Sequence, residues 1–111
     1  MLSKDKRLNL KKDFSWVASG RQTSNNLFKL FFRSGDNQNP RVGIALSKAN
    51  FKKAVDRNRA RRLISIVFEA LYDKLTKQIN IVVLPKKEIL DKSVAEISQE
   101  LEQMLDKYHL L

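Results

Sequence analysis

The chain has 111 residues and a formal net charge of +10 at pH 7. This length supports one compact core and is too short for two ordinary domains, so a single domain over residues 1–111 is expected. Residues 1–62 contain 16 Lys plus Arg against 4 Asp plus Glu, a net charge of +12, whereas residues 63–111 have a net charge of −2. Such an excess of cations in one half favours a polyanionic partner, above all nucleic acid.

The composition excludes several chemistries. The chain has no cysteine, so disulfides and thiolate metal sites are excluded, and His109 is its only histidine, so no His pair can cleave RNA by acid–base catalysis. The charged amino terminus differs from a signal peptide, and the longest fully apolar run, 81–84, is far shorter than the roughly 20 residues of a membrane-spanning helix. We therefore expect a cytoplasmic protein without catalytic groups or a metal site of its own.

The amino-terminal region is polar. Residues 1–10 are expected to form a loose basic tail. A short helix is predicted from about Lys12 to Ser19, ending at Gly20, because glycine commonly follows a helix.

Three segments have strand patterns. Apolar and basic residues alternate over 27–33, which predicts a strand. The turn-forming residues 34–40 are expected to close a hairpin into a second strand over 41–47. The segment 79–84 is apolar almost throughout and is stopped by Pro85, so it predicts a strand that is covered on both faces and lies at or near the centre of a sheet.

Two segments have helical spacing. The longer helix is predicted from about Ala54 to Thr76, and the last helix from about Lys92 or Ser93 to Tyr108. The expected core-facing residues of the longer helix are Ala60, Leu63, Ile64, Val67, Leu71 and Leu75. Those of the last helix are Val94, Ile97, Leu101, Met104 and Leu105.

The first candidate binding surface is the face of the strand that carries Lys29, Phe31 and Arg33. A ring between two cations can stack on a base while the cations contact phosphates, as in proteins that bind single-stranded nucleic acid. The alternative is that Phe31 packs beneath a neighbouring helix, since sheets are often covered on both faces.

The second candidate surface is the start of the longer helix, where Asp56 is the only acid among residues 52–62. A step of 100° per residue places Arg57, Asn58, Arg61 and Arg62 on one polar arc, with Arg59 toward its flank. Guanidinium groups bind phosphate oxygens and stack on bases. A solvated charged surface, or binding to anionic membranes through this helix, are the alternatives.

In the order and spacing of its motifs, the chain resembles the protein subunit of bacterial ribonuclease P. The motifs are Asp13-Phe14, the strand from Phe28 to Arg33, Arg41-Val42-Gly43, Ser47-Lys48, Ala54-Val55, Arg57-Asn58-Arg59, Arg61-Arg62-Leu63-Ile64, Phe68 and Ile81-Val82-Val83. The resemblance implies an α/β (α+β) two-layer sandwich of order α-β-β-β-α-β-α, with a mixed sheet of about four strands. It also implies a left-handed βαβ crossover, against the usual preference, and a short strand near residues 21–25.

The family's function implies the partners of this chain. Members bind the catalytic ribonuclease P RNA and hold the 5′ leader of precursor tRNA in a cleft between the first helix and the sheet, while the RNA, with Mg²⁺, cleaves the phosphodiester bond. The residues expected to face the catalytic RNA are Arg57, Asn58, Arg59, Arg61, Arg62, Lys48, Lys52 and Lys53. The residues expected to line the leader cleft are Phe14 and Phe31, with Lys29 and Arg33 added from strand geometry.

Three positions depart from the family pattern. Ala18 stands where a second aromatic residue is common, and the nearby Trp16 is two positions away from that place. Phe31 stands where tyrosine is frequent. Ser65 stands where a basic residue is common. A structural RNA-binding protein, for instance a ribosomal one, remains a rival interpretation of the same basic helix.

Overall fold

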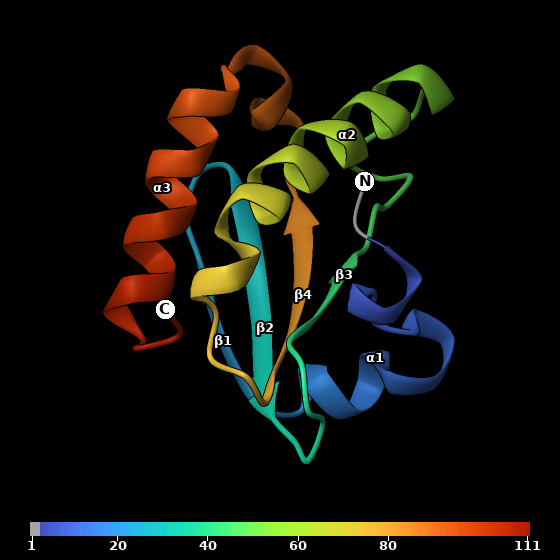
Figure 1. Ribbon diagram of the computed structural model, residues 1–111. Coiled ribbons are helices and arrows are strands. Elements are labelled where there is room, and N and C mark those ends of the chain that lie inside the picture. The colour runs from blue at the N-terminus through green and yellow to red at the C-terminus, as the bar shows by residue number, and fades with distance from the viewer. Residues whose placement is uncertain (1–2) are drawn as a thin grey trace.

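The computed structural model describes residues 3–111, which form a four-stranded mixed sheet with helices on both faces (Figure 1). In chain order the elements are α1 (Leu10–Ala18), β1 (Arg21–Ser24), β2 (Phe28–Ser34), β3 (Arg41–Ile44), α2 (Ala54–Leu71), β4 (Ile79–Pro85) and α3 (Val94–Lys107). Single 3₁₀ turns lie at Lys4–Lys6, Tyr72–Lys74 and Lys87–Asp91. This order confirms the predicted α-β-β-β-α-β-α arrangement, including the short strand β1.

The last strand, β4, lies inside the sheet, whose order is β1-β2-β4-β3. It pairs antiparallel with β2, where Val82 faces Phe31, and parallel with β3, where Val82 faces Gly43. The predicted central, doubly covered strand is therefore confirmed. The predicted hairpin between β2 and β3 is wrong: residues 34–40 join two strands that do not pair, because the almost wholly apolar β4 takes the protected position between them.

The connection from β3 through α2 to β4 is a left-handed crossover. In Figure 1 the arrow of β4 points upward, α2 passes in front of the sheet, and β4 lies to the left of the parallel strand β3. This handedness opposes the strong right-handed preference of such units. It agrees with the fold that the family resemblance implied.

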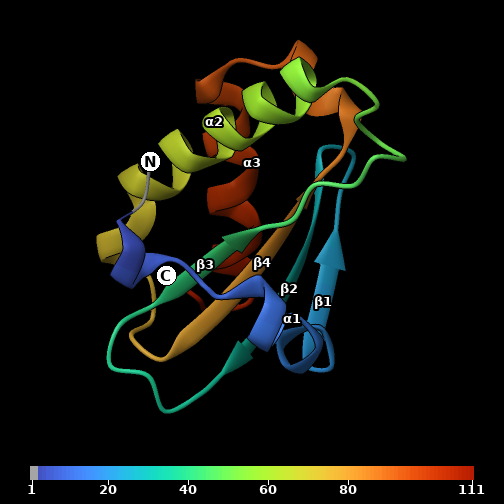
Figure 2. The ribbon, with the colours of Figure 1, turned by 90° about the vertical axis from the view of Figure 1, so that its right-hand side faces the viewer.

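The main hydrophobic core lies between the sheet and the pair α2 and α3, which cover the same face (Figure 2). The inward residues Leu30 of β2 and Ile81 of β4 are completely buried there. Most of the residues predicted to face the core from α2 and α3 are buried. Leu63 and Met104 are only partly buried, and Val94 is exposed. The bounds differ from the prediction at two ends, since α2 stops at Leu71 and β3 at Ile44.

Helix α2 buries a wider surface than predicted. Ser65 and Phe68 are buried as well: Phe68 belongs to the main core, and Ser65 lines a small cavity that it shares with the amino-terminal segment and β3. Burying one large apolar side chain contributes roughly 1.5–3 kcal/mol, against a total stability of about 5–15 kcal/mol for a whole domain. The apolar side of α2 is thus committed to the core.

A second, smaller apolar cluster lies on the opposite face of the sheet, beneath α1. Val17 of α1 and Val82 of β4 are fully buried in it, and Phe14 and Phe31 are partly buried against them. Glycine permits the close approach of α1 to β3, since a Cβ atom at Gly43 would lie 2.7 Å from Leu10 Cδ2.

The amino-terminal segment packs on the rest of the protein from Lys6 onward, which differs from the expected loose tail over residues 1–10. The backbone N–H of Leu8 donates to the Val42 carbonyl at 3.0 Å, and the Leu8 side chain is buried. Lys6 Nζ lies 4.5 Å from the centroid of the Tyr72 ring. Helix α1 also begins two residues early, at Leu10, because Asn9 caps it.

Helix α3 starts with a capping box. The Ser93 hydroxyl accepts a hydrogen bond from the Glu96 backbone N–H, and the Glu96 carboxylate accepts one from the Ser93 backbone N–H. The backbone N–H of Ser93 is the main cause that lowers the pKa of Glu96 below its ordinary 4.5, helped by the Ser93 side chain and opposed by burial. The ionised carboxylate is therefore favoured in the folded protein.

We expect Glu96→Gln to destabilise the protein at neutral pH. A carboxyl group whose pKa is lowered by folding stabilises the fold above its unfolded pKa, and this contribution is lost as the pH falls through the folded pKa. The difference in unfolding free energy between wild type and Glu96→Gln should thus be constant near neutrality and shrink below pH 4.5. Urea unfolding followed by circular dichroism measures it. Glu100→Gln, an exposed carboxylate later in α3, is the control; an equal pH dependence in both variants would contradict the capping role.

Candidate nucleic-acid interface

The arginine surface is built on the first turns of α2 and on the loop before it. Arg57 is half-buried, and its guanidinium donates hydrogen bonds to the carbonyls of Phe51 at 2.8 Å and Lys52 at 3.3 Å. Since the Phe51 side chain is buried in the core, these bonds tie the loop to the helix. Arg57 thus has a structural task that the sequence did not predict, in addition to its predicted contact with RNA.

The remaining arginines of this surface face outward. The guanidinium of Arg61 donates to the Asn58 side chain at 3.2 Å, which confirms that these two residues share one side of the helix. Arg59 and Arg62 are exposed. The ion pairs Lys74–Glu102 and Lys92–Glu96 both lie away from this surface, and Asp56 is the only acid among residues 52–62.

The sequence also predicted three lysines of the loop before α2 as RNA contacts, and their side chains are open to solvent. Lys48, Lys52 and Lys53 are all exposed, and Lys53 occupies the position before the first residue of α2. The amino-terminal segment adds a cation that the sequence did not place here. Arg7 and Arg61 line one small cavity of about 150 Å³ between that segment, β3 and α2. The signal that could have found Arg7 is the basic composition of the first residues.

The strand surface predicted around Phe31 lies where α1 crosses the sheet. The rings of Phe14 and Phe31 meet edge to face, with centroids 6.1 Å apart and an interplanar angle of 73°. Both side chains are only half-buried. Lys29 Nζ lies 5.0 Å from the centroid of the Phe31 ring. Phe31 therefore packs against a helix, as one alternative predicted, and still presents part of its ring to solvent beside a cation, as the other requires.

Arg33 does not flank Phe31, so the prediction of a ring between two cations is wrong on that side. Its guanidinium donates to the Ser19 hydroxyl at 2.7 Å and to the Trp16 carbonyl at 3.2 Å, and it lies 4.6 Å from the centroid of the Trp16 ring. The Trp16 carbonyl is available because the last carbonyls of a helix lack helical partners, and Ser19 is the residue that caps the end of α1. The sequence prediction missed this contact because it joins residues that are far apart in the chain.

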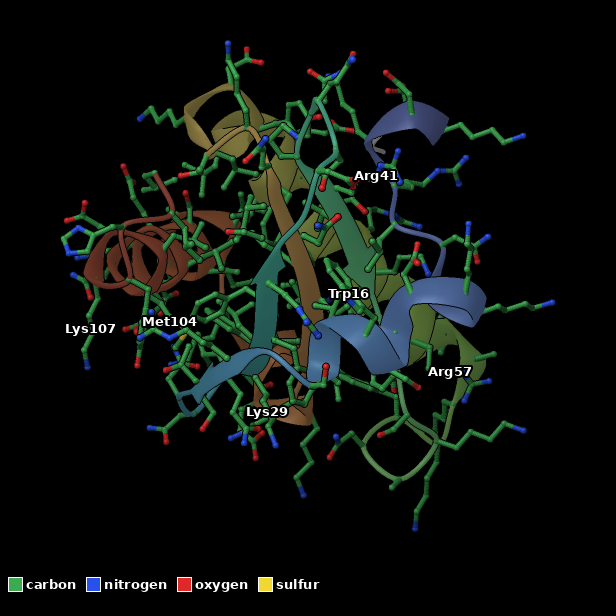
Figure 3. All side chains as sticks on the ribbon, turned by 90° about the horizontal axis from the view of Figure 1, so that it is seen from below. Trp16, Lys29, Arg41, Arg57, Met104 and Lys107 are labelled. Carbon is green, nitrogen blue, oxygen red and sulfur yellow. The ribbon has the colours of Figure 1, made fainter. Side chains whose placement is uncertain are left out.

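A polar groove of about 890 Å³ lies on the side of α1 that carries Trp16, between the amino-terminal segment and the loop from β2 to β3. Figure 3 shows Trp16 between Arg41, which lines the groove, and Lys29, which lies toward the Phe31 side; Arg57 lies farther out beside α2. Asn80 forms the floor, where its buried amide donates to the Arg33 carbonyl and to the Asn37 side chain. The sequence analysis did not predict this groove.

Residues 3–111 contain no group of three or more His, Asp or Glu side chains placed to hold a metal ion. In the same range, the helices are too short or too polar to cross a bilayer.

Known proteins share both the sequence and the fold of this chain. A ribonuclease P protein component of Shouchella clausii is 30% identical over 112 residues, which cover 99% of this chain and 91% of that protein. One from Nitrosococcus oceani is 38% identical over 53 residues, which cover 47% of this chain and 44%, less than half, of that relative's length. The solved ribonuclease P protein of Thermotoga maritima superposes with a TM-score of 0.81 at 25% identity, covering 91% of this chain and 96% of that one.

The family model described as ribonuclease P matches residues 2–109, nearly the whole chain. The match includes both surfaces described above, the arginine surface on α2 and the Phe14–Phe31 pair beneath α1. This chain therefore belongs to the ribonuclease P protein family.

Proposed function

We propose that this chain acts in tRNA processing as the protein component of ribonuclease P, in the cytoplasm, and that it binds both the catalytic RNA and the 5′ leader of precursor tRNA. The observation that carries the proposal is the half-exposed Phe14–Phe31 pair with Lys29 over its ring. An aromatic face beside a cation suits a base and its phosphate in a single strand, and is sequence-tolerant. The leader is the single-stranded part of such a substrate.

The arginine surface of α2 is proposed to contact the catalytic RNA. Arg59 and Arg62 are exposed, Arg61 is partly exposed, and the three lysines of the preceding loop are exposed as well. This array spans more than one turn of helix, so it can contact several phosphates of a folded RNA at once. Arg57 contributes by fixing the loop that carries Lys52 and Lys53.

Catalysis is proposed to lie with the RNA. The described residues offer no cluster that fits a divalent metal, and the lone His109 cannot supply an acid and a base. We propose that Mg²⁺ is held mainly by the RNA. The role of the protein is then to position the leader and to neutralise phosphates, which reduces the repulsion between two polyanions.

The rival interpretations are less well supported. Membrane binding through α2 requires its apolar side to be exposed, but Ile64, Val67 and Phe68 are buried in the core. A ribosomal protein would share the basic helix, but the family match extends over residues 2–109 and includes the aromatic pair beneath α1.

Reconstitution tests the proposed function as a whole. Added to the catalytic RNA at low magnesium, the protein should increase the rate of precursor tRNA cleavage, because its cations replace part of the counterion requirement. Cleavage is followed on gels with end-labelled precursor. No increase, together with a footprint on ribosomal RNA, would favour the ribosomal alternative.

Phe31→Ala tests the leader cleft. Loss of one stacked base costs about 1–3 kcal/mol, so the affinity for precursor tRNA should fall about fivefold or more while the affinity for mature tRNA changes little. Equilibrium binding of both tRNAs to the reconstituted complex measures this. Val94→Ala, an exposed apolar residue on α3, serves as the control. Equal losses for precursor and mature tRNA would remove Phe31 from the leader cleft.

Arg61→Ala tests the arginine surface. Removing one phosphate contact should reduce the slope of log K against log salt by about one for binding of the catalytic RNA. Filter binding at several salt concentrations measures the slope. Lys77→Ala, an exposed lysine after α2, is the control and should leave the slope unchanged. The same slope for wild type and Arg61→Ala would show that Arg61 does not contact phosphate.

A further inference from the structure

Trp16 is an exposed aromatic residue that the proposed leader cleft does not use. It lies two residues after Phe14 in α1, which is about 200° around the helix axis. Whereas Phe14 packs on Phe31, the Trp16 side chain is 39% exposed and lines the polar groove of about 890 Å³. An indole left open to solvent in a concave polar site is a candidate binding element.

The Trp16 ring is held in place rather than free. Arg33 lies 4.6 Å from its centroid, and two hydrogen bonds from the guanidinium to the end of α1 fix that position. At the ring edge, Gly35 leaves the necessary room, because a Cβ atom there would lie 3.0 Å from Trp16 Cη2. A ring oriented in advance loses little conformational entropy when a ligand stacks on it.

The groove around Trp16 carries both signs of charge. Its cationic lining residues are Lys4, Arg7, Lys12 and Arg41. Three aspartates, Asp5, Asp13 and Asp36, line it as well, so its net charge is only about +1. A nucleotide suits this mixture of charges, because its base N–H groups can donate to the carboxylates while its phosphate contacts the cations.

We propose that Trp16 and Arg33 form a second stacking platform that binds an unpaired nucleobase of single-stranded RNA, on the side of α1 that faces Arg41. The groove cations contact the phosphates next to that base. The inference rests on the proposed function in that the ligand is RNA, but the site is separate from the Phe14–Phe31 pair. The base comes either from the precursor leader or from an unpaired segment of the catalytic RNA.

Trp16 is the only tryptophan of the chain, so its fluorescence reports directly on this site. A short oligoadenylate should quench the emission, because a stacked base contacts the indole. An abasic oligomer of the same length and charge, at the same occupancy by calorimetry, should leave the emission nearly unchanged. The quenching should persist in Phe31→Ala once that variant is saturated. Equal responses to both oligomers would overturn the inference.

The affinities of Trp16 variants for RNA identify the source of the base. Trp16→Ala should weaken RNA binding about fivefold or more, whereas Trp16→Phe, which keeps a ring, should retain most of the affinity. Circular dichroism confirms that each variant is folded, and Val94→Ala is the exposed apolar control on α3. A loss confined to precursor tRNA assigns the leader as the source, and a loss confined to the catalytic RNA assigns that RNA.

The two proposals fail in different ways. If Trp16→Ala binds precursor tRNA, mature tRNA and the catalytic RNA like wild type, the platform is overturned, even if Phe31→Ala still loses precursor binding selectively. If instead Phe31→Ala shows no selective loss but oligoadenylate still quenches Trp16, the leader cleft fails and the platform stands as an RNA site.

Discussion

The burial of β4 on both of its faces is the constraint on which the rest of the structure depends. Ile81 and Val83 point into the core beneath α2 and α3, while Val82 between them is fully buried beneath α1. Such a strand is stable only with a neighbour on each edge and a layer on each face. β2 and β3 are the strands that pair with its two edges, and the three helices cover its two faces.

This arrangement also decides where the charges lie. With α2 committed to the core through Ile64 and Val67, its Arg59 and Arg62 face outward, while Arg57 is half-buried against the loop before the helix. On the opposite face, α1 covers the middle of the sheet and leaves an exposed surface on each side of the helix. One side carries the partly exposed Phe31 beside Lys29, and the other carries the groove at Trp16. A protein with a charge of +10 thus separates its cations into distinct surfaces instead of concentrating them in one cleft.

Local patterns predicted the elements well because each pattern reflects one face of one element. The alternation of β2 and the helical stripe of α2 are both found in the structure, apart from their ends. The hairpin over residues 34–40 failed because turn-forming residues show where a chain bends and not which strands pair. Likewise the first ten residues look like a tail in isolation, and only the free edge of β3 gives Leu8 and Arg7 something to pair with.

The amino-acid sequence by itself determined the element order, the central place of β4, the arginine side of α2 and, through its motifs, the ribonuclease P family. Apart from the short strand β1 and the family itself, which the resemblance of the motifs implied, these follow from periodicity and composition, which are properties of neighbouring residues. The tertiary structure decided that Arg57 donates a hydrogen bond to the loop before α2 and that the Arg33 guanidinium lies over the Trp16 ring. It also decided that Arg7 and Arg61 line the same small cavity. Each of these depends on contacts between elements, and a long, flexible side chain takes the partner that packing brings within reach.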